Sequence, residues 1–166
     1  ILEGEDEIVD VSIELPLQAY IPDAYISISK DKINAYQKLS SADNEEYLKE
    51  IRQDLVEDYG KMPEEVENLF KIIELKMAAK KAGIVNVKSE MIPMSDDKEI
   101  VLQMSGRVKP ANIINMLEHN GKWQIIGSRL KIKMKDLGFV WPDELQKCLD
   151  KLGEKAVHGA RKELLS

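Results

Sequence analysis

The residues best able to hold a metal or act as a nucleophile are few in this sequence, and they are scattered. Cys148 is the single cysteine, and the two histidines, His119 and His158, lie far apart. A zinc site draws on several His, Cys or carboxylate ligands at short, regular spacings. Neither histidine has such a spacing, so we expect no metal site and no cofactor. Cys148 falls within a helical pattern, and we interpret it as a small apolar side chain of the core.

Motifs for nucleotide or acyl chemistry are missing from the sequence. It contains no GxxxxGK[ST] phosphate loop, no GxGxxG after a strand and no nucleophile elbow. Acidic pairs such as Glu57-Asp58 and Glu64-Glu65 are abundant, but acid-base catalysis needs a cleft that shifts a carboxyl pKa. Helical spacing places these pairs on exposed faces. We therefore predict that the chain is not an enzyme and has no catalytic residues.

A row of carboxylates on one predicted helix is the most distinctive polar feature. Glu46, Glu50, Asp54 and either Glu57 or Asp58 recur every three or four residues and so share one helical face. Like charges at that spacing repel one another by a few tenths of a kcal/mol each, and an opposing basic surface would relieve the repulsion. The alternative is that the row only keeps the helix soluble, with Lys49 and Arg52 neutralising part of it. Both interpretations stay open on the residues alone.

Composition and charge indicate a soluble domain with an acidic first part. The 166 residues are 43% apolar and 33% charged, which suits one domain with its own core. Residues 1–68 carry 18 acidic and 6 basic side chains, whereas residues 69–166 carry 12 and 18. An acidic surface repels DNA and favours a basic protein partner. Without a long apolar run or a disulfide, we expect a cytoplasmic protein with no membrane contact.

The elements that position the acidic row are helices, followed by strands. Hydrophobic spacing predicts three helices, over about 29–39, 43–59 and 63–82, the second opened by a capping box of Asp43 and Glu46. Alternation predicts a strand over 8–15 and two antiparallel hairpins, over 84–104 and 123–134, with a short helix from Pro110 between them. A last helix starts near Pro142. The predicted fold class is α+β: N-terminal helices packed with a small, mainly antiparallel sheet and a C-terminal helix. Residues 1–7 are expected to be a linker, and residues 8–166 a single domain.

The second hairpin offers a competing function. Lys131, Lys133 and Lys135 alternate with apolar residues, and Trp123 and Arg129 lie nearby. Such a face suits a nucleic acid, with the indole ring stacking on a base. We keep an accessory DNA-binding domain, using this basic half, as the alternative.

Two segments of the sequence resemble the TRCF domain family of bacterial transcription-repair coupling factors. The first reads Leu15-Pro-Leu-Gln-Ala-Tyr-Ile-Pro-Asp-Ala-Tyr-Ile26. The second reads Asp54-Leu-Val-Glu-Asp-Tyr-Gly-Lys-Met-Pro-Glu-Glu-Val-Glu-Asn-Leu69. Ala78-Ala-Lys-Lys-Ala-Gly-Ile84 completes the pattern, so the resemblance covers residues 9–86 closely and the remainder weakly. Tyr59 departs from the phenylalanine that is frequent in the family, and we expect it to pack all the same.

The resemblance implies a regulatory role within a larger protein. The family's parent is an ATP-driven DNA translocase that displaces stalled RNA polymerase and recruits the repair protein UvrA through a UvrB-like module. The resemblance implies a non-catalytic C-terminal domain that folds back on that module, masks its UvrA-binding surface and restrains the motor. The partner is then intramolecular, UvrA and RNA polymerase are reached indirectly, and no direct DNA contact is expected.

The resemblance also points to part of the acidic row. The family's domain meets basic side chains of the UvrB-like module through acidic residues just before the glycine that ends the second helix. The matching positions here are Asp54 and Glu57, with Glu50 and Glu46 one and two turns earlier. We predict these four residues as the protein interface.

Overall fold

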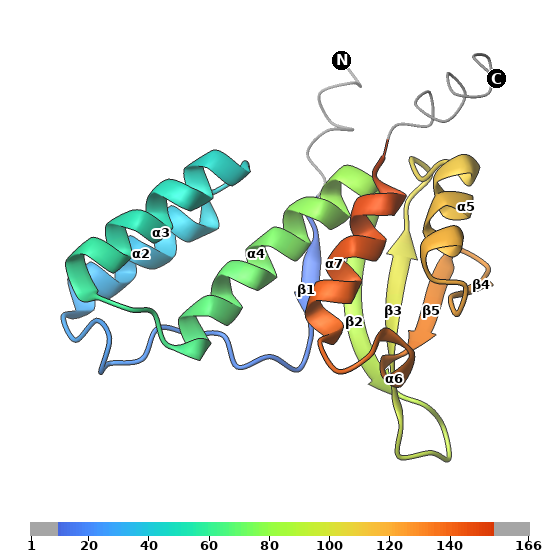
Figure 1. Ribbon diagram of the computed structural model, residues 1–166, viewed down its shortest axis with the longest axis horizontal. Helices are drawn as coiled ribbons and strands as arrows, with labels where there is room; N and C mark the ends of the chain where they lie inside the picture. The colour runs from blue at the N-terminus through green and yellow to red at the C-terminus, as the bar shows by residue number, and fades with distance from the viewer. Residues whose placement is uncertain (1–9, 155–166) are drawn as a thin grey trace. The chain divides into compact units, whose positions relative to one another are not determined.

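The computed structural model describes residues 10–154 and has the predicted α+β class (Figure 1). Its elements are, in order, β1 (Ser12–Glu14), α2 (Ser29–Ser40), α3 (Glu45–Tyr59), α4 (Glu64–Ala82), β2 (Ile84–Met91), β3 (Lys98–Met104), α5 (Pro110–His119), β4 (Gln124–Ile126), β5 (Arg129–Lys133), α6 (Met134–Leu137) and α7 (Trp141–Leu152). The predicted linker 1–7, the first two residues of the predicted strand 8–15 and His158 lie outside the described residues.

Internal contacts divide the chain into two compact units. Pro16–Met77 forms one, which we call the helical unit. The other, the sheet unit, is discontinuous in sequence and combines, among the described residues, 10–15 with 78–154. Helix α4 begins in the first unit and ends in the second, so each unit is described separately below.

The helical unit is built from α2, α3 and the first turns of α4 around one apolar core. Leu48, Ile51 and Leu55 of α3 are buried together with Val66 and Phe70 of α4. Their spacing of three and four residues gives each helix one apolar stripe, and burying these stripes against each other stabilises the unit. Helical spacing in the sequence assigns Ile33, Tyr36 and Leu39 or Ala35 to the buried side of α2. The structure buries Ala35 and Leu39, whereas Ile33 is 55% exposed.

The segment between β1 and α2 contains no helix or strand, and it turns after Pro22, whose carbonyl oxygen accepts hydrogen bonds from the backbone N–H groups of Tyr25 and Ile26. The segment packs along the helices. The backbone N–H of Ile21 donates to the Tyr36 hydroxyl oxygen, 2.7 Å away. The Tyr25 hydroxyl lies 2.8 Å from the carbonyl oxygen of Gly60 and 3.2 Å from that of Leu55. These bonds satisfy polar groups that burial would otherwise leave unpaired. They tie the segment to α2 and to the end of α3.

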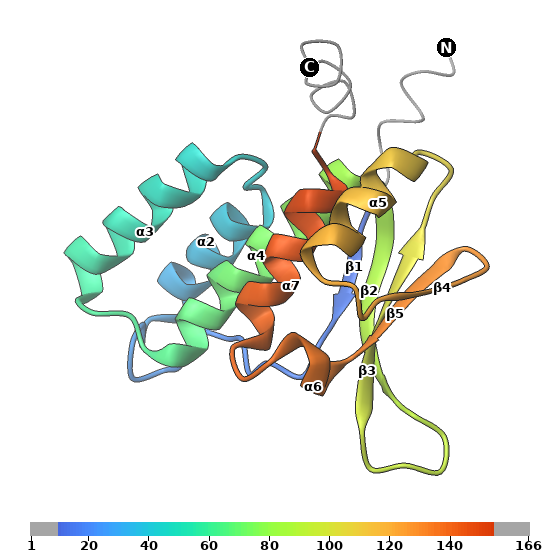
Figure 2. The ribbon, with the colours of Figure 1, turned by 45° about the vertical axis from the view of Figure 1, so that its right-hand side comes forward.

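The sheet unit contains a five-stranded sheet in the order β1-β2-β3-β5-β4. Both predicted hairpins are present as antiparallel pairs, β2 with β3 and β4 with β5. Strand β1 lies parallel to β2, with Ser12 opposite Asn86, which sequence alternation alone does not reveal. Helices α5 and α7 lie on one face of the sheet (Figure 2). Their buried residues Met116, Leu145 and Leu149 complete the core there.

None of the helices within residues 10–154 combines the length and the apolar character needed to cross a membrane.

Candidate functional site

Helix α3 begins at a side-chain cap and ends at a glycine. The Asn44 side chain accepts a hydrogen bond from the backbone N–H of Tyr47 at 2.8 Å, satisfying a donor of the first turn. The predicted capping box is therefore wrong: Asp43 lies one residue too early to cap a helix that begins at Glu45. Gly60 ends the helix at φ +88, a conformation that other residues rarely adopt.

The four predicted interface residues lie together on the outer face of α3. Glu46, Glu50, Asp54 and Glu57 are all exposed, on the side opposite the buried Leu48, Ile51 and Leu55. Among residues 10–154, no ion pair within 4.0 Å includes any of the four. We call these four carboxylates the acidic face.

Arg52 does not neutralise the acidic face. Its Nη1 atom donates to Oε1 of Glu67 at 2.8 Å, and its guanidinium carbon lies 4.7 Å from the centre of the Phe70 ring. Both partners belong to α4, so the cation points away from the acidic face and holds the two helices together. Lys49 is exposed on α3. The outer face of the helix thus keeps an excess of negative charge.

Tyr59 packs as expected at the end of α3. Its ring centre lies 5.7 Å from that of Tyr25, with the planes tilted by 53°. The pair joins the extended segment to the last turn of the helix, beside Glu57. The two resemblance segments of the sequence therefore meet in the structure and fix the end of the acidic face.

The basic hairpin is less available for binding nucleic acid than its sequence indicated. Trp123 is only 4% exposed, and its indole N–H donates to Sγ of Cys148 at 3.3 Å, so the ring is not free to stack on a base. The Nζ atom of Lys131 lies 3.5 Å from Oε2 of Glu99, and the Nζ atom of Lys135 lies 3.5 Å from Oδ2 of Asp97. Lys135 belongs to α6, so the alternation of lysines along one strand stops at Lys133.

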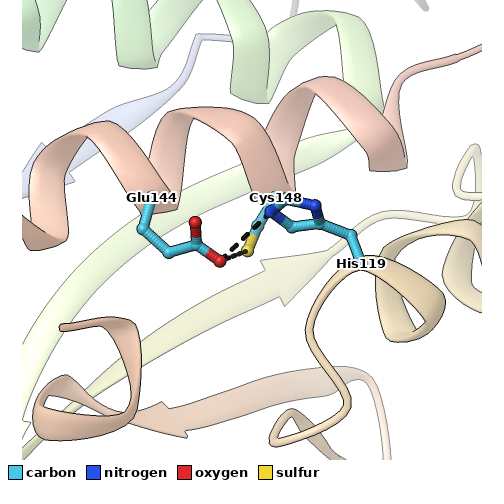
Figure 3. Close-up of side chains that lie close together, drawn as sticks. All are labelled: His119, Glu144 and Cys148. Atoms are coloured by element: carbon cyan, nitrogen blue, oxygen red, sulfur yellow. Dashed lines mark hydrogen bonds and ion pairs between the residues drawn. The ribbon is translucent and has the colours of Figure 1, made fainter.

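The structure brings together three residues that no sequence motif connected. His119, at the end of α5, points toward Glu144 and Cys148, one turn apart on α7 (Figure 3). His119 Nε2 lies 3.1 Å from Glu144 Oε2, and Cys148 Sγ lies 3.8 Å from the same oxygen. Cys148 is buried as expected, and burial raises the pKa of its thiol to about 12. The i,i+4 spacing of Glu144 and Cys148 was the available signal.

Comparison with known proteins identifies related domains. Residues 15–110 match the family model described as the TRCF domain. Over 136 residues the chain is 32% identical to the transcription-repair-coupling factor of Staphylococcus haemolyticus strain JCSC1435, and 31% identical to that of Staphylococcus epidermidis strain ATCC 12228. Each match covers 82% of this chain but 11% of the relative. The chain thus spans about a tenth of the length of these relatives.

A solved structure shares the fold. It is described as the crystal structure of the C-terminal domain of transcription-repair coupling factor, and it matches with a TM-score of 0.71 and 23% identity. The match covers 90% of this chain and 93% of that chain. Both the helical unit and the sheet unit are therefore elements of a known fold.

Proposed function

Because this chain belongs to the TRCF domain family, we propose that it is a non-catalytic regulatory domain of a transcription-repair coupling factor. In this proposal the domain docks on a UvrB-like module of the same polypeptide in the cytoplasm. Docking masks the surface that binds UvrA and restrains the DNA translocase. RNA polymerase and UvrA are then affected indirectly, without DNA contact by this domain.

The observation that supports the proposal most directly is the acidic face of α3. Its four carboxylates are exposed, and the arginine of the same helix is turned toward α4. Four like charges along one face repel one another, so a basic surface that approaches them gains attraction and relieves the repulsion. Asp54 and Glu57 also occupy the positions to which the family resemblance assigns the contact. A basic partner is thus the chemistry that this surface fits.

A weak contact is sufficient for such a clamp. Two parts of one polypeptide joined by a short flexible connection meet at an effective concentration of about 1 mM. A contact with a Kd of about 0.1 mM would then keep the domain docked about 90% of the time. The remaining open fraction gives UvrA access, and a modest loss of affinity would enlarge that fraction several-fold.

Direct DNA binding by the basic hairpin is the less favoured function. Two of its lysines lie near carboxylates of the same sheet unit, and its tryptophan is buried. Each pairing reduces the number of cations available to phosphates, on which nonspecific affinity depends. The hairpin therefore contributes more to the stability of the sheet than to a nucleic-acid surface.

Binding in trans tests the proposed docking. The purified 166-residue chain is titrated against a separately expressed UvrB-like module at two salt concentrations. We expect a complex with a Kd of about 0.1 mM that weakens as salt screens the charges. Absence of a complex at low salt would contradict the proposed docking. A complex that salt does not weaken would show that the acidic face does not contribute to it. A salt-sensitive complex with duplex DNA near physiological salt would favour the alternative instead.

A further inference from the structure

We propose that His119, Glu144 and Cys148 form a binding site for a divalent transition-metal cation such as Zn²⁺. The bound cation would join α5 to α7. This inference is independent of the proposed docking and concerns the sheet unit alone. The sequence favoured no metal site because its two histidines and one cysteine are far apart. The fold removes that objection, since α5 and α7 place one nitrogen, one oxygen and one sulfur donor side by side (Figure 3).

The donor atoms are close to the separations that a tetrahedral cation requires. Zinc binds His nitrogen and carboxylate oxygen at about 2.0–2.2 Å and Cys sulfur at about 2.3 Å, so neighbouring ligand atoms lie roughly 3.3–3.6 Å apart. The nitrogen-oxygen distance is 3.1 Å and the sulfur-oxygen distance is 3.8 Å. All three atoms lie within 4.8 Å of one another. Closing the ligand set therefore needs side-chain adjustments of about 1 Å.

The ligand types balance the charge of the cation. A Glu144 carboxylate and a Cys148 thiolate together neutralise two positive charges, and a neutral His119 adds none. Thiolate is the form of cysteine that binds metal, so the thiol proton leaves to solvent on binding. The mixed nitrogen, sulfur and oxygen set suits zinc or cobalt, whereas magnesium prefers oxygen ligands alone.

Polar groups around the three donors already hold them in place. The Asn120 side-chain amide donates to Glu144 Oε2 at 3.1 Å. The indole N–H of Trp123 is aimed at Cys148 Sγ, a weak acceptor as a neutral thiol and a much stronger one as a thiolate. Such second-layer hydrogen bonds orient metal ligands in proteins. The buried N–H therefore has a better partner with a cation present than without one.

The site is anchored on one side and open on the other. Leu145 and Leu149, next to the two α7 ligands, are fully buried in the core and fix the helix. The side chains of His119 and Glu144 are 25% and 24% exposed. A cation can thus enter from solvent and take a water molecule as its fourth ligand, as three-ligand zinc sites do.

Cobalt and zinc titrations of the 166-residue chain test the site. We expect Co²⁺ to give a sulfur-to-metal charge-transfer band, and Zn²⁺ to displace it. At a concentration of about 100 times its Kd, Zn²⁺ should raise Tm by about 5 °C or more, and Mg²⁺ should not. If the chain gave neither the band nor the rise in Tm, the three side chains would be a hydrogen-bonded cluster only, and the proposal would be overturned.

Substitutions locate the cation. His119→Gln and Glu144→Gln replace partly exposed side chains by polar ones of similar size, and both should weaken Zn²⁺ binding at least tenfold. Cys148→Ala should abolish the cobalt band. His158→Gln, the matched change at the other histidine, should leave both readouts unchanged. Loss of binding in His158→Gln, together with full binding in His119→Gln, would place the cation elsewhere and contradict the proposal.

Discussion

The Nη1 atom of Arg52 lies 2.8 Å from Oε1 of Glu67, which turns the arginine of α3 toward α4. This ion pair has two effects. It joins the two helices at the edge of their core, beside Phe70, and it leaves the four carboxylates on the outer face of α3 without an arginine nearby. The same contact therefore bears on the stability of the helical unit and on the charge that this unit presents to a partner.

Reversing two charges of the acidic face should open the proposed clamp. In the full-length protein, Asp54→Lys with Glu57→Lys replaces two attractions by repulsions, and about 1 kcal/mol for each gives a loss of affinity of roughly 30-fold. The open fraction would rise from about 10% to about 75%. We expect UvrA binding to increase about sevenfold, and basal ATPase activity to rise with it, as measured by titration and by phosphate release.

The control for that experiment carries the same change in charge on the sheet unit. Asp96 and Glu118 are exposed there, and neither takes part in an ion pair among residues 10–154. Asp96→Lys with Glu118→Lys should leave UvrA binding and ATPase activity unchanged. An equal increase in both double variants would mean that net charge, rather than the acidic face, controls the protein.

Removing the Arg52 side chain should destabilise the helical unit. Arg52→Ala loses a half-exposed ion pair and a cation-π contact, each contributing up to about 1 kcal/mol, so we expect a loss of about 1–2 kcal/mol in urea unfolding. Lys49→Ala, on the same helix, should change stability by less than about 0.5 kcal/mol. A double-mutant cycle with Glu67→Ala measures the ion pair itself, and a coupling energy of zero would show that the packing against Phe70 dominates.

The cap of α3 predicts a difference between neighbouring residues. Asn44→Ala removes the acceptor for the Tyr47 N–H and should cost about 1 kcal/mol of unfolding free energy. Asp43→Ala should cost much less, because Asp43 only accepts a bond from the Asn44 side chain. Chemical denaturation measures the free energy of unfolding of both variants. A larger loss in Asp43→Ala would indicate that Asp43 caps the helix, as the sequence predicted.

Stability at alkaline pH should depend on Tyr25. Burial raises the pKa of its phenol, and the nearby charges of Glu67 and Tyr59 raise it further. A pKa raised by folding gives stability that is complete below the ordinary phenol value of about 10 and is lost as pH rises through the folded value. Tyr25→Phe should lower stability by about 1 kcal/mol at pH 8 and flatten its decline above pH 10. Tyr20→Phe, at a tyrosine that is 46% exposed, is the control and should do neither.

Much of the fold could be predicted because its signals are local. The stripe of Leu48, Ile51 and Leu55 defines α3 within one segment of sequence, and both hairpins are formed by strands adjacent in the chain. The parallel pairing of β1 with β2 was not predictable in this way, since it depends on contacts between residues far apart. The exposure of Ile33 has the same origin: helical spacing assigned it to a core from which the packing of α2 excludes it.

The acidic face could be predicted from local sequence, whereas the proposed metal site could not. The acidic face follows from the spacing of Glu46, Glu50, Asp54 and Glu57 within one helix, so the sequence alone could predict that these residues share an exposed face. The cluster of His119, Glu144 and Cys148 depends on how α5 and α7 pack on the sheet. Only the spacing of Glu144 and Cys148 was visible beforehand, and on its own it is typical of any helix.

The pairing of β1 with β2 also sets an order of events during synthesis on the ribosome. Ser12 and Asn86 are separated by 74 residues, and the whole helical unit is encoded between them. At a translation rate of about 5–20 residues per second, β2 is synthesised roughly 4–15 seconds after β1. The sheet therefore gains its outer strand late, from a segment that leaves the ribosome before the helical unit does, and a fragment that begins after residue 15 would expose the open edge of β2 to pairing with other chains.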